Sequence, residues 1–338
     1  MKALVLGGST FVGLHTVREL VARGHHVTVL NRGVTSVQLP AGISRLIADR
    51  TDTESMRSAL RGTQWDAVLD TSGFVMVAGG SDLDHLIDLF DGNVGHYIYC
   101  SSIMAYEQSG VFPWSEDFKL TGDPAGTYGG FKAHVEQKLF TRHRSTGFPV
   151  TTVRPAAIYG PNNNIYDMEA PMFMRLLRGL PILVPHQGLV ICSYGHVDDL
   201  VRFMIDLAGN GAAKGEAFNL TAEAVTVNHY IRTLAEIVGK EPDIVYLPED
   251  SLASLPPSAY CHLFGTNHHS MLSIEKARRL LGFEPEFDFR TGHQATFDWF
   301  MESGLADTEE SLRDPIWRAS YDFAVEAQIA ASIRSRAS

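Results

Sequence analysis

A tyrosine and a lysine four residues apart could move a proton to or from a substrate. Tyr128 and Lys132 lie at the start of a segment, residues 128–143, that we expect to be a helix, and this spacing places both side chains on one helix face. An ammonium group close to a phenol favours the phenolate, so the tyrosine could exchange a proton with a hydroxyl or a carbonyl during hydride transfer. The same spacing also occurs by chance on solvated helix faces, which is the alternative for the pair taken alone.

Two serines could supply a hydrogen bond to the same reaction. Ser101 and Ser102 follow residues 96–100, a short apolar segment that we expect to be a strand. In open α/β sheets, ligands bind outside the carboxyl ends of the strands. A hydroxyl at this point could therefore bind the reacting oxygen of a substrate, although without the tyrosine it is equally well explained as the end of a strand.

The N-terminal segment has the pattern of a dinucleotide site. An apolar strand at residues 2–6 leads into the turn Gly7-Gly-Ser-Thr-Phe-Val-Gly13, which is followed by a helix to residue 23 and a strand at residues 26–30. Such a turn lets backbone N–H groups approach a pyrophosphate at the helix N-terminus, and the surrounding elements are those that a dinucleotide fingerprint requires. Thr10 stands where the usual G-x-x-G-x-x-G spacing has glycine. An ordinary strand–turn–helix is the alternative.

Strands and helices alternate through the first half of the chain, and residues 107–127 look like a loop over an active site. Alternation of this kind predicts an α/β fold with a Rossmann-type, doubly wound parallel sheet. The further strands are expected at residues 43–47, 65–70, 96–100 and 150–154, and helices are expected at residues 83–90 and 128–143. Another helix is expected to be capped by Asp52 or Thr53 and to end at residue 60.

The regular alternation lapses after residue 155. The expected domains are a Rossmann domain of residues 1–160 and 196–240, a smaller mixed α/β substrate lobe of residues 161–195 and 241–315, and a C-terminal tail of residues 316–338. The helices of this half are expected at residues 168–178, 227–238, 274–281 and 290–303, with Thr226 as the cap of the second. A further helix is expected to end at residue 207 and to be capped by Asp198 or Asp199. The strands are expected at residues 180–185, 189–194, 217–220 and 243–247.

Composition and charge limit the class of protein. The 338 residues are 45% hydrophobic and carry a formal charge of −11, which is typical of a globular protein and disfavours nucleic-acid binding. Cys100, Cys192 and Cys261 are widely spaced, so buried free thiols are expected, and the histidines show no metal-ligand spacing. Met1 leads straight into a strand, and no apolar run is long enough to cross a membrane. We expect a cytoplasmic protein without a metal or a membrane partner.

The order of the motifs resembles that of the extended short-chain dehydrogenase/reductases, and among them the sugar-nucleotide epimerase/dehydratase family. The similar stretches cover roughly residues 1 to 300. They are Gly7 to Gly13, Tyr99-Cys-Ser-Ser102 with Tyr106, Tyr128-x-x-x-Lys132, Val153-Arg-Pro155 with Tyr159-Gly-Pro161, His196-Val-Asp-Asp199-Leu200, Phe218-Asn-Leu220 and Ser273 to Phe283. The ending Asn31-Arg32-Gly33, the segment from Thr127 to Lys132 and Tyr194-Gly-His196 are most similar to a bacterial subgroup related to the chloroplast stem-loop RNA-binding proteins.

The resemblance implies roles for individual residues. Tyr128 would be the general acid/base, Lys132 would hold the nicotinamide ribose, and Ser102 would bind the reacting substrate oxygen. The implied cofactor contacts are Gly7, Ser9, Thr10, Phe11, Val12, Gly13, Asn31, Arg32, Asp49, Arg50, Thr71, Ser72, Gly73, Pro155 and Ala157. Substrate contacts are expected from Ser101, His186, Tyr194 and His196, and a homodimer is expected through the helices at residues 83–90 and 128–143.

Three departures from the family pattern narrow the function. Asn31-Arg32 replaces the aspartate of NAD-preferring relatives, which favours NADP over NAD, although Arg32 could instead stack on adenine or point to solvent. Ile103 and Met104 replace the Asp-Glu pair of the 4,6-dehydratases, which argues against that reaction. The arginine that often touches the nucleotide is missing before His196. Arg154, Arg175 or Arg178 could contact phosphate instead, with a structural role favoured for Arg154.

The expected function is an NAD(P)-dependent oxidoreductase or epimerase acting on a hydroxyl or ketone of a sugar or sugar-nucleotide-like substrate. The motifs are the same for an NADPH-dependent ketone reductase, and the family resemblance favours the epimerase. A non-catalytic RNA-binding or cofactor-sensing protein is the alternative from a different class. The complete set of Ser102, Tyr128 and Lys132 and the negative charge argue against it.

Overall fold

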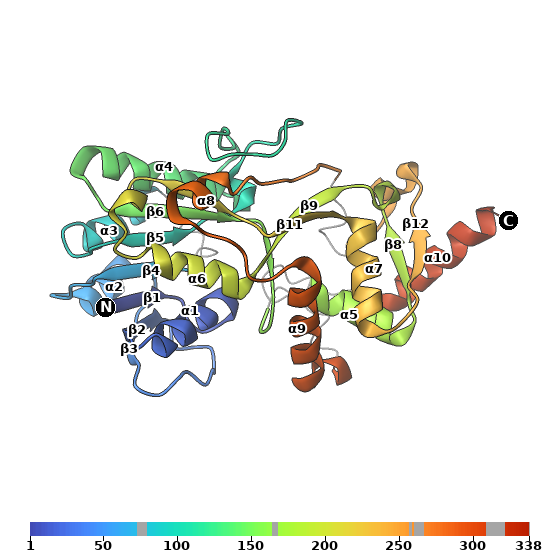
Figure 1. Cartoon of the computed structure of the whole chain (residues 1–338), viewed down its shortest axis with the longest axis horizontal. Helices are drawn as coiled ribbons and strands as arrows, with labels where there is room; N and C mark the ends of the chain where they lie inside the picture. Colours follow the sequence, from blue (N-terminus) through green and yellow to red (C-terminus); the bar gives the residue numbers. More distant parts are fainter. Residues whose placement is uncertain (73–79, 164–167, 257–258, 260–266, 309–321, 338) are drawn as a thin grey trace. The chain divides into compact units, whose positions relative to one another are not determined.

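The computed structural model of the chain describes residues 1–72, 80–163, 168–256, 259, 267–308 and 322–337 (Figure 1). The chain divides into two compact units. The first consists of Met1–Ile158, Val197–Thr221 and Leu272–Glu286, and the second of Tyr159–His196, Ala222–Met271 and Phe287–Ser338. These limits differ from the expected domains at three segments, because residues 222–240 and the expected tail of residues 316–338 fall in the second unit, and residues 272–286 fall in the first.

The first unit is built on a seven-stranded parallel sheet with the strand order β10-β6-β5-β4-β1-β2-β3. The chain runs outward from β1 to β3 and then returns to the other side of β1. This is the topology of a doubly wound sheet, and it confirms the predicted fold class. The strands are β1 (Lys2–Leu6), β2 (His26–Asn31), β3 (Ser44–Ile47), β4 (Ala67–Asp70), β5 (Tyr97–Cys100), β6 (Val150–Pro155) and β10 (Ala217–Leu220).

Helices cover both faces of this sheet. Successive residues of a strand point to opposite faces, so Val5 packs with α1 and α6, whereas Leu4 packs with α2, α3 and α4. The strands are therefore apolar on both sides, as is usual for a parallel sheet. The helices of the first unit are α1 (Phe11–Ala22), α2 (Thr53–Leu60), α3 (Gly80–Phe90), α4 (Tyr128–Thr146), α6 (Val197–Leu207) and α8 (Glu275–Leu281).

Two of the three predicted helix caps are confirmed. Asp52 accepts the backbone N–H groups of Glu54 and Ser55 at the start of α2, and Thr226 accepts an N–H at the start of α7 (Val227–Val238). The third prediction was wrong, because α6 begins at Val197 and both Asp198 and Asp199 lie in its first turn. Their negative charges are favourable at the positive end of the helix dipole without either being the cap.

The second unit is a smaller mixed lobe. Its strands β9 and β11 pair antiparallel, and β8 and β12 pair parallel. Strand β7 (Ala157–Tyr159) crosses the boundary between the two units along the chain. The other elements are α5 (Glu169–Arg178), α9 (Phe289–Glu302), α10 (Phe323–Ala337), β8 (Pro181–Val184), β9 (Ile191–His196), β11 (Glu223–Thr226) and β12 (Asp243–Tyr246).

In the described ranges no helix is long and apolar enough to cross a membrane. Cys100 and Cys192 are buried free thiols, as predicted, and Cys261 lies outside the described residues.

A buried ion pair within the second unit joins the C-terminal helix α10 to α5. Arg175 of α5 donates to both carboxylate oxygens of Glu326 on α10, at 2.8 and 2.6 Å, and both side chains are at most 3% exposed. Arg178 lies with its guanidinium 5.9 Å from the Phe323 ring. Arg175, considered above as a phosphate contact, therefore serves to anchor α10, which accounts for part of the tail left without a role by the sequence.

We predict that Glu326→Ala lowers the free energy of unfolding by about 3–5 kcal/mol, because it leaves a buried guanidinium without its counter-charge. Urea unfolding followed by circular dichroism measures the change. Arg334→Ala is the matched control, because it removes the exposed ion pair of the same helix with Asp243 and should cost less than about 1 kcal/mol. Equal losses from both variants would contradict the assignment.

Candidate active site

Glycines shape the turn between β1 and α1. Gly7 and Gly8 have φ angles of 106° and 79°, which residues with a side chain rarely adopt. A Cβ atom at Gly13 would lie 2.6 Å from the backbone nitrogen of Gly8, so only glycine lets the first turn of α1 pack this closely. The backbone of residues 7–13 therefore lies close to the N-terminus of α1, as a pyrophosphate site requires.

The backbone conformation of Thr10 explains why this position of the turn does not need the glycine of the usual spacing. Thr10 has an extended backbone, with φ −142° and ψ 153°, and it is exposed at the cap position of α1. Any residue adopts this conformation, so glycine is not required there. Phe11 buries its ring edge-on against His15, while Ser9 and Val12 are half-buried.

At the end of β2, Asn31 turns towards the glycine turn. Its side-chain amide donates to Ser9 Oγ at 2.6 Å and to the Gly7 carbonyl at 3.3 Å. Its oxygen accepts the Gly33 N–H at 3.0 Å. Asn31 therefore braces the turn, whereas the next residue, Arg32, is exposed.

Asp49, after β3, is the nearby acidic group. Its carboxylate accepts the Thr51 N–H at 2.9 Å and the Thr51 hydroxyl at 2.7 Å. These hydrogen bonds, together with the charge of Arg32, lower the pKa of Asp49. Asp49 is therefore an anion within electrostatic reach of Arg32.

Arg50, expected among the cofactor contacts, lies in a buried ion pair instead. Its guanidinium donates to the two carboxylate oxygens of Asp70, at 2.6 and 2.7 Å, and to Ser72 Oγ. Tyr97 donates its hydroxyl to the same carboxylate at 2.6 Å. Burial alone would raise the pKa of Asp70, but Arg50 and these hydrogen bonds hold it below its usual value. Arg50 therefore fixes the Asp70 carboxylate and the Ser72 hydroxyl at the end of β4.

The remaining expected cofactor contacts also follow or end strands. Thr71 follows β4 and donates its hydroxyl to the Leu6 carbonyl at 3.0 Å. Pro155 ends β6 and is buried, whereas Ala157 at the start of β7 is half-buried. Gly73 lies outside the described residues. Carboxyl ends of parallel strands are the edge at which such sheets bind ligands.

Tyr128 and Lys132 come together on α4. Thr127 caps this helix by accepting the Gly130 N–H at 3.2 Å, so Tyr128 is its first residue. The Lys132 ammonium is 5.6 Å from the centre of the half-buried Tyr128 ring and 4.9 Å from that of Tyr99. It is only 3% exposed.

The buried ammonium of Lys132 is held by the end of β5. It donates to the Cys100 carbonyl at 2.6 Å. Burial alone would lower the pKa of Lys132, but attraction to Tyr99, Tyr128 and Cys100 raises it above its usual value. The lysine therefore keeps a full positive charge beside the phenol of Tyr128.

Ser102 lies in a segment that packs against the first turn of α4. Its Oγ accepts the Met104 N–H at 3.1 Å and caps the short 3₁₀ turn Ile103–Ala105. A Cβ atom at Gly129 would lie 2.3 Å from the Met104 carbonyl oxygen. Glycine between Tyr128 and Lys132 therefore allows the serine-bearing segment to touch the helix, which the spacing of these two residues did not reveal.

Two expected substrate contacts lie in the interior of the second unit. The Tyr194 ring stacks on Tyr230 with centroids 5.5 Å apart, and the His196 ring stacks on Phe287 at 3.9 Å. Both Tyr194 and His196 are buried. Their rings contribute to the packing of this unit rather than to an open substrate surface.

The other two expected contacts have partners as well. Ser101 is buried and donates its hydroxyl to the Glu136 carboxylate, so the structure gives it an internal role in place of the expected one. His186 is half-buried, and its Nδ1 lies 3.1 Å from a Glu249 carboxylate oxygen.

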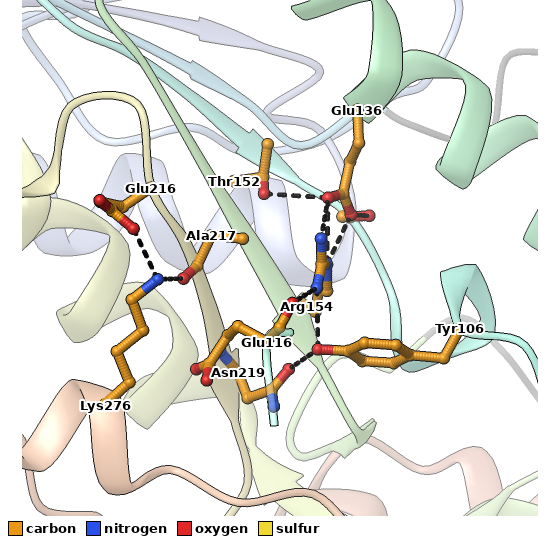
Figure 2. A network of polar contacts seen from close by, with 10 residues as sticks. Tyr106, Glu116, Glu136, Thr152, Arg154, Glu216, Ala217, Asn219 and Lys276 are labelled. Atoms are coloured by element: carbon orange, nitrogen blue, oxygen red, sulfur yellow. Dashed lines mark hydrogen bonds and ion pairs between the residues drawn. The ribbon is translucent and has the colours of Figure 1, made fainter. Parts of the chain in front are cut away.

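A buried polar network beside the site is the feature that the sequence did not predict. Figure 2 shows Arg154 of β6 between the carboxylate of Glu136 and the hydroxyl of Tyr106, which in turn donates to Asn219 of β10. The structural role favoured for Arg154 is confirmed. Glu136 lies four residues beyond Lys132, so extending the spacing that singled out Tyr128 and Lys132 could have found it.

Comparison with known proteins identifies the family. The profile of the NAD dependent epimerase/dehydratase family matches residues 3–221. The chain belongs to this family. Membership makes it an NAD(P)-dependent enzyme, as the motifs predicted, and agrees with the glycine turn described above.

Relatives carry several different descriptions. A chloroplast stem-loop binding protein of 41 kDa from Arabidopsis thaliana is 33% identical over 306 residues, covering 86% of this chain and 77% of the relative. A UDP-N-acetyl-alpha-D-glucosaminuronate decarboxylase from Bacillus cytotoxicus is 26% identical, with 89% and 98% covered.

Solved structures support the fold. The UDP-glucose 4-epimerase of Thermotoga maritima, solved with UDP-glucose, has a TM-score of 0.73 and 24% identity, with 90% of this chain and 99% of that chain covered. At this identity the likeness shows the fold and leaves the substrate open.

We predict that Gly129→Ala destabilises this epimerase-family protein by about 1–3 kcal/mol, because the added methyl group would overlap the Met104 carbonyl and force α4 away from the serine segment. Urea unfolding measures the loss. Gly126→Ala, three residues earlier and before the start of α4, adds a methyl group with no atom within 4 Å and should leave stability within about 0.5 kcal/mol. Tolerance of Ala at position 129 would argue against the close contact.

Proposed function

We propose that the protein is an epimerase or oxidoreductase for a hydroxyl or ketone of a sugar or sugar-nucleotide-like substrate, with Tyr128 as the general acid/base. The observation that carries this proposal is the buried Lys132 ammonium fixed between the Cys100 carbonyl and the Tyr128 ring. A positive charge at this place stabilises the negative charge that develops on the Tyr128 oxygen while a substrate proton is transferred.

The glycine turn fits a bound dinucleotide. The close packing of Gly13 on the Gly8 backbone, and the left-handed backbone at Gly7 and Gly8, bring the backbone of the turn to the N-terminus of α1, where N–H groups can bind a pyrophosphate. Residues 7–13, with Thr71 and Ser72, would hold the cofactor. When bound, the cofactor supplies or accepts the hydride.

Ser102 would orient the reacting oxygen. Its Oγ accepts the Met104 N–H, so its own proton can be donated to a substrate hydroxyl or carbonyl. Tyr128 would then take the proton from a hydroxyl, or return it to a carbonyl, on the same oxygen. Lys132 keeps its charge throughout and stabilises the phenolate.

We predict that Tyr128→Phe lowers kcat by about 10²–10⁴-fold, because the proton carrier is lost, while the Kd for the dinucleotide changes less than about twofold. Turnover is measured by NMR and by absorbance of reduced cofactor with UDP-glucose, UDP-galactose, dTDP-glucose and UDP-glucuronate. Tyr246→Phe, at a partly exposed tyrosine of β12, is the control. An unchanged rate in Tyr128→Phe would remove the catalytic assignment.

The dinucleotide carried through purification separates an epimerase from a reductase. An epimerase returns the hydride and keeps its cofactor oxidised, so denaturing the fresh protein should release near-stoichiometric oxidised dinucleotide. A protein purified empty that oxidises NADPH in the presence of a ketone would be a net reductase. The family resemblance favours the first outcome.

We further propose a preference for NADP. The end of β2 carries no carboxylate to repel a 2′-phosphate, since Asn31 is turned to the glycine turn and the exposed Arg32 offers a guanidinium. Homodimer formation through α3 and α4 and a cytoplasmic location stay predictions.

Arg32→Ala should weaken NADP binding about 10–100-fold, the effect of losing one charge-assisted contact, and leave NAD binding within about twofold. Equilibrium titration with each dinucleotide measures the two Kd values. Arg57→Ala removes an exposed arginine of α2 paired with Glu54 and is the control. A parallel loss for both dinucleotides would show that Arg32 does not read the 2′-phosphate.

RNA binding is the second candidate, because the relative at 33% identity is described as a stem-loop binding protein. The formal charge of −11 is unfavourable for it. Filter binding of a stem-loop RNA at two salt concentrations tests this function: salt-sensitive binding by a protein with no turnover would favour it over catalysis.

A further inference from the structure

We propose that the Glu136–Arg154 ion pair positions the catalytic serine by holding both ends of the turn on which Ser102 lies. Ser101 and Tyr106, at the two ends of this turn, are then positioning residues. This inference rests on the proposed function, which gives Ser102 its role.

The first end of the turn is held by Glu136. The residues Tyr128, Lys132 and Glu136 follow one another at four-residue spacing along one face of α4. Lys132 donates to the Cys100 carbonyl at 2.6 Å, and Glu136 accepts the hydroxyl of Ser101. Two successive residues at the end of β5 are thus bound to α4, immediately before Ser102.

The second end of the turn is held by Arg154. Its Nη1 donates to the Tyr106 hydroxyl oxygen at 2.9 Å and to the Glu116 carbonyl at 3.0 Å. Tyr106 comes directly after the turn Ile103–Ala105 and donates its own hydroxyl to Asn219 Oδ1 at 2.7 Å. One end of the turn is therefore bound to Glu136, and the other end is bound to Arg154.

The ion pair itself has little freedom to move. Glu136 is fully buried and accepts Arg154 Nε at 3.0 Å and Nη2 at 2.7 Å on one carboxylate oxygen. Thr152 donates to this oxygen as well, at 3.2 Å. Charge-assisted bonds of this kind are about twice as strong as neutral ones, so the pair is a fixed reference for both ends of the turn. Figure 2 shows the pair with Tyr106, which lies at the second end.

The network also reaches the loop of residues 107–127. Asn219 donates to the Trp114 carbonyl at 2.9 Å, and its backbone N–H donates to the Glu116 carboxylate at 2.8 Å. Trp114 is buried with Tyr106 and Leu272 in one apolar cluster. This part of the loop is therefore built into the same unit as the turn, and it supports Tyr106 from the other side.

Ser101→Ala and Thr152→Val form a matched pair of variants. Each removes one hydroxyl donated to the same carboxylate, but only Ser101 belongs to the turn end that leads into Ser102. Tyr106→Phe removes the contact at the other end and serves as the second test variant. All three are studied as the full chain saturated with NADP, and kcat is normalised to the number of dinucleotide-binding sites.

The first measurement is hydrogen–deuterium exchange at residues 101–106. The amides of Met104, Ala105 and Tyr106 are hydrogen-bonded within this turn. In Ser101→Ala and Tyr106→Phe they should exchange about tenfold faster, whereas Thr152→Val should match the wild type. Wild-type exchange in both test variants, or equal acceleration in Thr152→Val, would overturn the proposal whatever the activity.

The second measurement separates positioning from simple destabilisation. With the four nucleotide sugars named above, kcat of the two test variants should fall about tenfold while KM and the dinucleotide Kd stay within about twofold, since misplacing a catalytic group affects the chemical step. Equal losses in KM and Kd would overturn the positioning role. If the wild type turns over none of these sugars, the proposed function has failed and the exchange result alone decides this inference.

Discussion

The first unit depends on the buried Lys132 ammonium, whose lost hydration has to be replaced by contacts within the protein. Removing a charged group from water costs several kcal/mol unless nearby groups replace the lost solvation. For Lys132 the replacement comes from the Cys100 carbonyl and from the ring faces of Tyr99 and Tyr128. Because that carbonyl belongs to the last residue of β5, the charge of the lysine fixes α4 against the carboxyl edge of the sheet.

The same edge contains two buried ion pairs, Arg50–Asp70 and Glu136–Arg154. Buried pairs contribute little net stability, since desolvation offsets most of their attraction. Their geometry is demanding, however, and each carboxylate here is also bound by a hydroxyl from the residues that follow a strand. The polar groups at the edge therefore keep fixed places while the apolar faces of the sheet supply the stability.

Local patterns were sufficient for much of the fold. Alternating apolar segments predicted the parallel sheet, and the short polar residues before α2 and α7 predicted their caps, because these features depend on neighbours in the sequence. The partners of Arg50, Glu136 and Ser101 could not be predicted. They lie 18 to 35 residues away along the chain, and no local pattern encodes which buried charges will meet.

Tertiary packing also explains the other differences between the predicted and the observed structure. Residues 222–240 follow β10 directly, so sequence order placed them with the Rossmann sheet, but α7 packs with α5 and α9 in the second unit. Tyr194 and His196 are polar enough to suggest a ligand contact, whereas stacking with Tyr230 and Phe287 accounts for them in the structure. Aromatic residues serve both purposes, and only tertiary packing distinguishes them.

The Asn31 side chain links the shape of the glycine turn to the charge at the end of β2. The Asn31 amide donates to Ser9 Oγ and to the Gly7 carbonyl, and a carboxylate has no proton to donate to either. An aspartate at this position would place its negative oxygens against the carbonyl that the amide now binds. Replacing Asn31 with aspartate would therefore change the bracing of the turn as well as the charge at the end of β2.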